Sequence, residues 1–512
     1  MLIWSLEPTD EDARPAFKNV TTCKKWLQQL QFTNLSATQA LVREQLAVFE
    51  RFPVRGLERL QVLETLRETV HQLQTDCAKR IDAKPLPLND VELAMLASIT
   101  GLWQSLATGY FRCLMAFDEG DKQLKTYGAL LCHRCLMYSG RQIFEYLRAG
   151  YELDGEQWRQ FHSIYLFAEE NGLLSVEVED EYSDQGQFTT CRFIYLKILF
   201  TCYARVQELS SRQQGLLDRW LSQWIDTLTI ERTCTVSRGD APPLAIDPAS
   251  MHGLQPLRQE LLGNANIRYL PMVPMSKLLR VKTILLQQGQ TPAQVGLGED
   301  HDGMDCIGLL THLHKHWCEP RPQRMAPRQG SAQEMVLRYG LEDVYSWLAP
   351  RQFDHQRLAH EIPQEAWRAE DLSILGARLM RIGKTGARIG LNRIVAVRAS
   401  DAYQMATTVW VSVTRTGELH MGIRFLPGTA TPVIARAAIK PGEPPGKPAP
   451  ALLLAAVPNL GIPPSLLIPR NLYQPERTVE LALPTREKQR VRLKYSVERG
   501  VDYERVSFLQ ER

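Results

Sequence analysis

The chain has 512 residues, which is enough for two or three domains, and 44% hydrophobic against 23% charged residues is typical of a soluble globular protein. A formal net charge of +3 argues against both a disordered polyelectrolyte and a general nucleic-acid coat, so we expect no DNA or RNA partner. The N-terminus lacks the cationic start and apolar core of a secretory signal, and five prolines interrupt residues 449–469, the most apolar long stretch. We therefore expect a cytoplasmic protein without a membrane span.

Residues 1–232 have the pattern of successive amphipathic helices. In one of them Leu57, Leu60, Leu63 and Leu66 recur at helical spacing and would form a single apolar stripe. Paired helices with short loops favour an α-solenoid or an irregular bundle, loosely similar to tetratricopeptide arrays although no clean period of about 34 residues is present. Such a domain usually binds another protein, so we predict a protein partner for this part. The expected helices are 36–52, 57–81, 89–116, 121–149, 156–171, 193–206 and 213–228.

Residues 233–320 form a mixed connecting segment in which we expect helices at 277–288 and 304–317. The second helix carries His312, His314 and His316. On a strand these three side chains would share one face and could hold zinc, whereas on the helix that we favour successive members point about 200° apart. We therefore predict no metal site there. The ten scattered cysteines are better explained as small buried hydrophobic residues of a reducing compartment than as a disulfide framework.

From about residue 324 onward the sequence changes to β-type alternation. Strands are expected at 334–339, 376–382, 391–399, 408–414 and 420–426. Beyond a Pro-rich stretch at 440–450 a second set follows at 451–456, 464–468, 478–483, 489–497 and 503–508. We therefore expect a multidomain α + β chain with an all-α N-terminal part and a β C-terminal part.

Two short motifs near the start of the β part suggest an anion site. Arg324 and Arg328 stand on the Pro-bearing stretch Arg-Pro-Gln-Arg-Met-Ala-Pro-Arg, and guanidinium groups both fork onto phosphate oxygens and stack on purine rings. The complement is Asp-Leu-Ser-Ile-Leu-Gly, in which Asp371 can accept from a guanine edge and Ser373 can donate to phosphate. Gly376 permits a close approach of the backbone.

The order of these motifs, Arg-x-x-x-Arg and then Asp-x-Ser-x-x-Gly, resembles the ligand signature of the PilZ domain family. The resemblance continues in Thr408–Arg415 and Leu419–Leu426, which look like the closing hairpin of that family. It covers about the last third of the chain and implies a small antiparallel β-barrel at residues 321–436 that binds cyclic di-GMP, extended by a further small β-domain at 437–512. It implies that the ligand contacts Arg324, Arg328, Asp371, Ser373 and Gly376.

A run of basic residues without acids follows the second motif: Arg378, Arg381, Lys384, Arg388, Arg393 and Arg398. Alternate members could face a dianionic dinucleotide, although a solvated strand face is the commoner arrangement. We add only Arg378 to the candidate cyclic di-GMP site.

The leading hypothesis is a bacterial signalling protein that is not an enzyme: it binds cyclic di-GMP in the β part, without a cofactor, and relays the signal through the helices to a partner protein. No nucleophile, base and orienting residue are recognisable together. The alternative is an adaptor or scaffold with a degenerate PilZ-like domain that no longer binds the ligand, which the long insert between the motifs favours. A hydrolase or nuclease would need clustered metal-binding carboxylates. The output (motility, pili, adhesion or exopolysaccharide), the ligand stoichiometry and the oligomeric state, a homodimer included, stay open.

Overall fold

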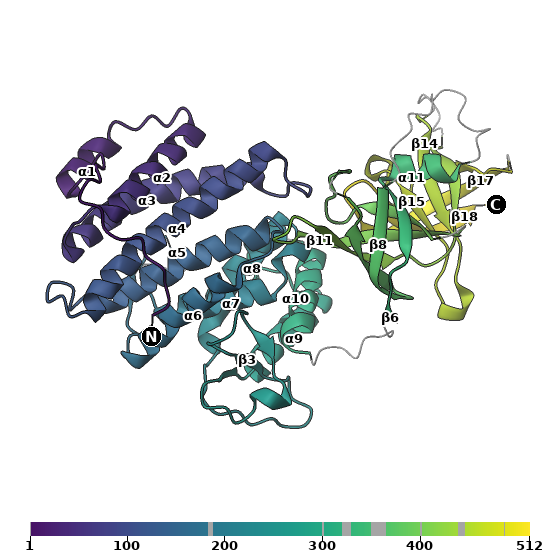
Figure 1. Cartoon of the computed structure of the whole chain (residues 1–512). Coiled ribbons are helices and arrows are strands. Elements are labelled where there is room, and N and C mark those ends of the chain that lie inside the picture. The colour runs from purple at the N-terminus through teal and green to yellow at the C-terminus, as the bar shows by residue number, and fades with distance from the viewer. Residues whose placement is uncertain are drawn as a thin grey trace. The chain divides into compact units, whose positions relative to one another are not determined.

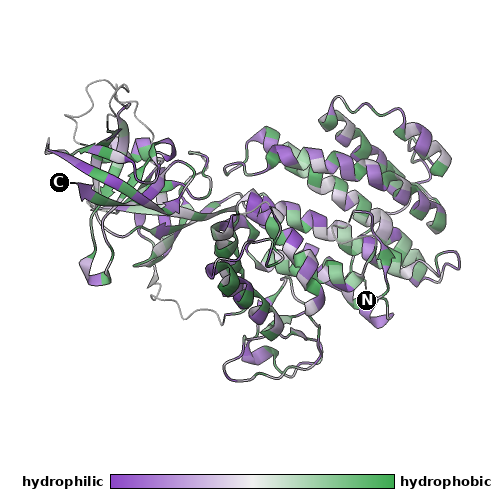
Figure 2. Cartoon of the chain, turned by 180° about the vertical axis from the view of Figure 1, so that it is seen from behind, coloured by the Kyte–Doolittle hydropathy of each residue, from purple (hydrophilic) through white to green (hydrophobic). Residues whose placement is uncertain are grey.

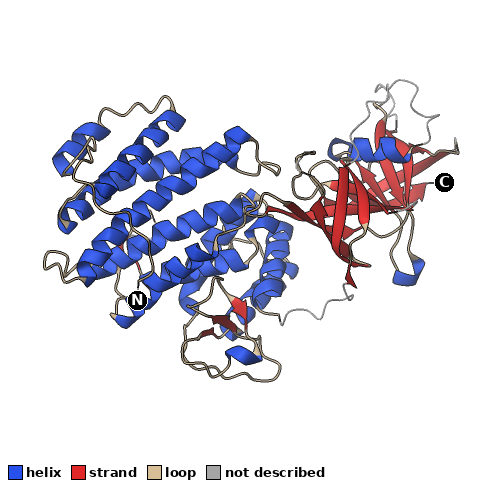
Figure 3. Ribbon diagram, viewed as in Figure 1, coloured by secondary structure: helices blue, strands red, loops and turns tan. Residues whose placement is uncertain are grey.

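The computed structural model describes residues 2–182, 188–299, 302–319, 329–349, 365–383, 385–399, 402–438, 446–485 and 487–511. It divides into two units. The helical unit consists of Met1–Lys84 and Leu88–Gln323, and the β unit consists of Pro85–Pro87 and Arg324–Arg512. Helices dominate the first unit and strands dominate the second (Figure 3). The prediction of a multidomain α + β chain is therefore confirmed.

The helices of the first unit follow one another along the chain, each packed on its neighbours (Figure 1). They begin with capping boxes at several places, for example Asn89 before α4 and Ser210 before α8, where a side-chain oxygen accepts from a free backbone N–H. Their bounds are α1 Val20–Leu27, α2 Leu35–Arg51, α3 Gly56–Ile81, α4 Asp90–Asp118, α5 Gly128–Arg148, α6 Gly155–Glu170, α7 Cys191–Tyr203, α8 Ser211–Trp224, α9 Val273–Gln287 and α10 Gly303–Trp317.

Most predicted helices agree with these bounds to within a few residues, but the helix expected from residue 121 begins only at Gly128. Residues 121–127 form turns instead, and Gly128 packs closely on the ring of Phe117. Figure 2 shows that most helices have one apolar and one polar side, as their spacing predicts. Among the described helices, none is long and apolar enough to cross a bilayer.

Two small sheets interrupt the helical unit. One is the hairpin of β1 (Val178–Glu179) and β2 (Phe188–Thr189). The other has the strand order β4-β3-β5 and contains β3 Leu244–Ile246, β4 Gln255–Pro256 and β5 Arg268–Leu270, with Ala245, Ile267 and Tyr269 as its core. All ten cysteines of the chain are free.

The β unit begins with an antiparallel sheet of strand order β6-β8-β7-β10-β11-β12-β9, which closes on itself because β8 also pairs with β9. Strands β6 and β7 pair with successive parts of the same edge of β8. Buried residues alternate with outward ones along β7, as expected for a barrel wall. The bounds are β6 Gln329–Gly330, β7 Glu334–Tyr339, β8 Glu365–Ser373, β9 Gly376–Arg381, β10 Ile394–Ala399, β11 Ala402–Val413 and β12 Leu419–Phe425.

A second closed barrel follows directly, with the strand order β13-β14-β15-β18-β17-β16. Its interior is aliphatic and includes Val433, Leu466, Val479, Val491 and Val506. The bounds are β13 Ala430–Ala437, β14 Ala449–Leu454, β15 Ser465–Ile468, β16 Thr478–Ala482, β17 Lys488–Arg499 and β18 Glu504–Glu511.

The short helix α11 (Leu341–Leu348) lies in the insert between the two sequence motifs. It packs against both barrels. Leu341 and Val344 share one apolar cluster with Ile394 of the first barrel and Leu452 of the second. This cluster explains why β10 is buried on both faces. The predicted pairing of residues 408–415 with 419–426 is confirmed as the hairpin β11–β12, whereas β8 and β13 were not among the predicted strands.

Candidate functional site: the β8–β9 hairpin

The Asp-x-Ser-x-x-Gly motif forms the tip of the β8–β9 hairpin, in which Ser373 pairs with Gly376. The Ser373 hydroxyl donates to the Gly376 carbonyl at 3.1 Å and accepts from the Leu375 amide at 3.3 Å, so it fixes the turn. A Cβ at Gly376 would lie 2.2 Å from the Ile423 carbonyl oxygen, which is why this position requires glycine. Ile374, between them, is 81% exposed. The turn is therefore rigid, with an apolar tip open to solvent.

A β-bulge follows on the outer face of the hairpin. Asp371 pairs with Arg378, Ala369 pairs with Leu379, and Glu370 is the extra residue between them. The Arg378 amide donates to Asp371 Oδ1 at 3.2 Å. The Arg378 guanidinium forms an ion pair with Glu370, with Nε and Oε2 2.5 Å apart. The Asp371 carboxylate is thus held in place by the backbone amide of Arg378. The bulge also turns the Glu370 carboxylate toward the Arg378 guanidinium, which the sequence predicts to be part of the site.

The pairing register aligns five residues in one row across five strands: Gly330, Asp371, Arg378, Gly422 and Trp410. The two glycines leave room on this row. A Cβ at Gly422 would lie 2.1 Å from Trp410 Nε1, so the indole occupies the space above the glycine. The Arg378 guanidinium carbon then lies 6.0 Å from the centre of the Trp410 ring. This row therefore places a cation beside an aromatic ring.

His420 borders the same surface from β12. Its side chain is only 6% exposed, and its Nδ1 lies 3.2 Å from Glu370 Oε2. Glu370 therefore contacts both Arg378 and His420, and its carboxylate is the negative centre of the outer face. Glu418 lies farther away, 4.0 Å from His420 Nε2.

Arg324 and Arg328 lie outside the described residues, but the strand that follows them is described. β6 begins at Gln329, the residue after Arg328, and Gln329 pairs with Leu372 while Gly330 pairs with Asp371. The described strand that follows the Arg-x-x-x-Arg motif in the sequence therefore pairs with the second motif. This strand precedes the insert that begins at Gly340.

The other described basic residues of the run have their own partners. Arg381, 2% exposed, pairs with Glu365 at 3.2 Å and stacks over Trp367. Arg388 donates to the Pro85 carbonyl, and Arg393 lies 3.9 Å from Asp502. Arg398 stacks on Trp347. Arg378 is the member of the run that borders the hairpin surface, while Lys384 lies outside the described residues.

Four residues that the sequence did not predict also lie beside the motif: Glu370, Trp410, Gly422 and His420. Gly422 follows His420-Met at the centre of the closing hairpin, and an isolated glycine inside a strand pattern signals a close approach of another group. The other three depend on strand register and on the bulge, which the sequence did not reveal.

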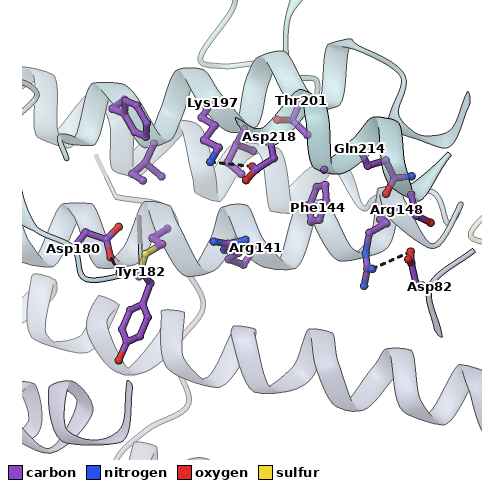
Figure 4. A pocket seen from close by; sticks show the side chains of 16 residues that line it. Asp82, Arg141, Phe144, Arg148, Asp180, Tyr182, Lys197, Thr201, Gln214 and Asp218 are labelled. Atoms are coloured by element: carbon purple, nitrogen blue, oxygen red, sulfur yellow. Dashed lines mark hydrogen bonds and ion pairs between the residues drawn. The ribbon is translucent and has the colours of Figure 1, made fainter. Parts of the chain in front are cut away.

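A second feature lies in the helical unit, where α5, α7 and α8 line a cavity of about 260 Å³ (Figure 4). Two of its cations are paired: Arg148 with Asp82 at 3.2 Å, and Lys197 with Asp218 at 2.9 Å. Arg141 points into the same groove, beside Phe144, and has no ion pair among the described residues (Figure 4). The groove therefore combines an apolar floor with one unpaired positive charge.

Comparison with known proteins now bears on both units. Residues 21–233 match the family model of the N-terminal domain of the cyclic-di-GMP receptor FimW, and residues 433–510 match that of the FimW C-terminal β-barrel domain. Both parts of the chain match the FimW family. The first match covers most of the helical unit, and the second coincides with the second barrel.

One curated FimW protein is also similar, the cyclic-di-GMP receptor FimW of Pseudomonas aeruginosa. It is 23% identical over 368 residues, which are 68% of this chain and 58% of that protein. The predicted relationship to a family of cyclic di-GMP receptors with a C-terminal barrel is therefore confirmed. The FimW relative is named as a cyclic-di-GMP receptor.

Proposed function

We propose that this protein is a cyclic di-GMP receptor that binds its ligand on the outer face of the first barrel, at the β8–β9 hairpin. The observation that carries the proposal is the pairing of β6 with β8: β6 begins at the residue that follows Arg328 in the sequence, and its Gln329 and Gly330 pair with Leu372 and Asp371. The similarity to FimW receptors supports the same ligand.

In this proposal the phosphates of the ligand contact arginines, and its guanine bases contact arginine, carboxylate and aromatic side chains. Arg324 and Arg328 contact the phosphates and stack on guanine, since guanidinium supplies both a bidentate fork and a flat face. Asp371 lies where a carboxylate can accept from a guanine edge. The Trp410 ring lies over Gly422 beside the Arg378 guanidinium, and an aromatic ring next to a cation suits stacking with a purine.

Glu370 opposes binding of a dianion until it is neutralised. The Arg378 guanidinium partly offsets its charge, and because the Arg378 side chain is 47% exposed the ion pair is worth about 0–1 kcal/mol. Such a pair can rearrange when arginines from the preceding loop bring phosphates to the surface. The hairpin can therefore accept an anion at little cost.

We further propose that the helical unit passes the signal to a partner protein through the groove around Arg141. Its apolar floor and single unpaired cation suit a partner segment that carries an acidic side chain next to an apolar one. Ligand binding would shift the population of partner-binding states by no more than the ligand's differential affinity for them.

Calorimetric titration of the full chain with cyclic di-GMP tests the proposal. We expect saturable binding, none with GMP or cyclic di-AMP, and a loss of about 1.5–3 kcal/mol of binding free energy in Arg324→Ala or Arg328→Ala, because each removes a charge-assisted contact. The matched control is Arg486→Ala with Arg490→Ala, a pair that has the same spacing in the sequence but lies outside both motifs. Unchanged affinity in both motif variants would disprove the site.

The second candidate function is an adaptor that has kept the barrel without the ligand. The observation in its favour is that Arg378 and the Asp371 carboxylate are engaged within the chain, by Glu370 and by the Arg378 amide. A folded protein that does not bind cyclic di-GMP, yet retains a partner through the Arg141 groove, would support this candidate.

A further inference from the structure

Three residues of the helical unit converge at a place distant in sequence from both motifs: Glu208, His312 and His316. Glu208 ends the 3₁₀ helix η1 (Val206–Glu208), and the histidines are on α10. One possible ligand atom from each lies within 4.8 Å of the other two. Such a cluster can either pack as neutral side chains or bind a cation.

The two histidines are four residues apart on α10 and therefore lie on one face of the helix. Their ring centroids are 4.4 Å apart. His314, between them, faces elsewhere and interacts with Ser276 at 3.1 Å and Arg280 at 2.9 Å. His314 points away from the other two histidines, as the helix predicts. The sequence did not predict that His312 and His316 lie side by side.

Glu208 presents one carboxylate oxygen to this pair. Its Oε1 is held by Arg205 Nη1 at 3.0 Å, while its Oε2 lies 3.8 Å from His316 Nε2. A separation of 3.8 Å is too long for a hydrogen bond. The Glu208 and His316 side chains are 10% and 19% exposed, so both polar groups are largely removed from water without satisfying each other. A group placed between them would satisfy both.

The nitrogens of the histidines are prepared as ligands. His312 Nε2 donates to the Ala204 carbonyl at 2.8 Å, which leaves the lone pair on Nδ1. Metal-binding histidines usually donate their other N–H to a carbonyl or carboxylate in this way. In His316 it is the Nε2 atom that faces the Glu208 carboxylate.

We propose that Glu208, His312 and His316 bind a divalent transition-metal ion of the Zn²⁺ class, with water completing the coordination. Two imidazoles and a carboxylate are a ligand set that suits Zn²⁺ and Co²⁺, whereas Mg²⁺ and Ca²⁺ prefer oxygen ligands. The ligand atoms must approach one another by about 1 Å to reach metal distances of about 2.0–2.2 Å. Because η1 and α10 are far apart in the chain, the ion stabilises the fold by cross-linking them.

Titration of the chelator-treated full chain with Co²⁺, followed by visible absorption, tests this proposal. We expect one equivalent to bind with the bands of a low-symmetry site and to be displaced by Zn²⁺. Loss of a ligand in His316→Asn or Glu208→Gln should weaken binding about 10–100-fold or more. His314→Asn is the matched control on the same helix and should bind Co²⁺ like the unaltered chain.

The melting temperature supplies a second readout. Zn²⁺ should raise it in the unaltered protein and in His314→Asn, but not in Glu208→Gln, which changes a single atom and should fold. Absence of Co²⁺ binding by the folded unaltered chain, or equal binding by all variants, would overturn the site. The variants should bind cyclic di-GMP unchanged, so failure of the metal site and failure of the barrel site are distinguishable.

Discussion

The helical unit and the β unit keep their charged groups in different places. In the helical unit, Arg67, Arg134, Glu64 and Asp180 lie together in the interior, with distances of 3.0–3.3 Å between partners. In the β unit most ion pairs lie on the surface, such as Arg490–Glu480, and Arg378–Glu370 at the candidate site. The helical unit thus contains a network of charges in its interior, whereas the ion pair at the candidate site of the β unit is open to solvent.

The interior network also involves aromatic hydroxyls. Tyr110 donates to Glu64 at 2.6 Å, and Arg67 donates to the Tyr138 hydroxyl at 2.9 Å. Burial alone would raise the pKa of Glu64, but Arg134 and Arg67 more than compensate, so its pKa lies below the ordinary value. The Glu64 carboxylate is therefore ionised at neutral pH, and removal of one of its partners would leave interior charge less well compensated.

The largest effect is expected for Arg134→Met. Removal of the buried Arg134 takes one of two arginine partners from Glu64, whose ion pair with Arg67 remains, so the free energy of unfolding of the helical unit should fall by about 3–5 kcal/mol. Hydrogen exchange of peptides from α3 to α5 in the full chain would measure this loss. Arg490→Met, which breaks an exposed pair, should cost about 0–1 kcal/mol in the barrels. Equal losses would contradict the contrast between the units.

The second-largest loss of stability is expected in acid, in the helical unit. Burial lowers the pKa of His162 to about 4, although the His252 carbonyl and Asp247 act in the opposite direction. Because the unfolded chain titrates near 6.5, it takes up the proton first as the pH falls from 6.5 toward 4, and this residue alone should cost about 3 kcal/mol over that range. Hydrogen exchange against pH would show the loss at α6.

His162→Gln provides the control for the acid effect. It should lower the stability at pH 7, because the bonds to Tyr195 and to the His252 carbonyl are altered, but it should also flatten the decline between pH 6.5 and 4. An equally steep decline in this variant would assign the acid sensitivity to other groups, such as the buried His133.

In the β unit the most sensitive point is the backbone of the hairpin. Gly376→Ala should cost about 2 kcal/mol, because the added Cβ would lie 2.2 Å from the Ile423 carbonyl oxygen and the strands must move apart. Gly390→Ala, where a Cβ meets nothing within 4 Å, should change stability by less than about 0.5 kcal/mol. Urea titration of both variants, with cyclic di-GMP binding measured in parallel, would test this difference.

The smallest effect, and the most specific, is expected for Glu370→Gln. This variant removes the negative centre of the outer face and releases Arg378, so affinity for cyclic di-GMP should rise about 1.5- to 5-fold, the equivalent of an exposed ion pair. Calorimetry at low ionic strength would resolve the change. Weaker binding would mean that Glu370 contacts the ligand, for example a guanine edge, and that it belongs to the site itself.

Much of the fold could be predicted because local patterns were strong. Leu60, Leu63 and Leu66 recur at helical spacing and are buried in α3, and Asn89 caps α4 where expected. β8 was missed because charged residues alternate in it with small or aromatic ones, Trp367 and Ala369, rather than with aliphatic residues. Because of β8, Asp371 and Ser373 lie at the end of a strand and not in an isolated turn.

By itself, the sequence determined the two structural classes, most helix bounds and the hairpin β11–β12, and it singled out Asp371, Ser373, Gly376 and Arg378 as candidates for the site. Only the tertiary structure decided which residues meet: the row from Gly330 to Trp410, the bulge at Glu370, the groove at Arg141 and the cluster of Glu208 with His312 and His316. The physical reason is that helix periodicity and turn chemistry act between near neighbours, whereas strand register and helix packing are set by burial of the whole core.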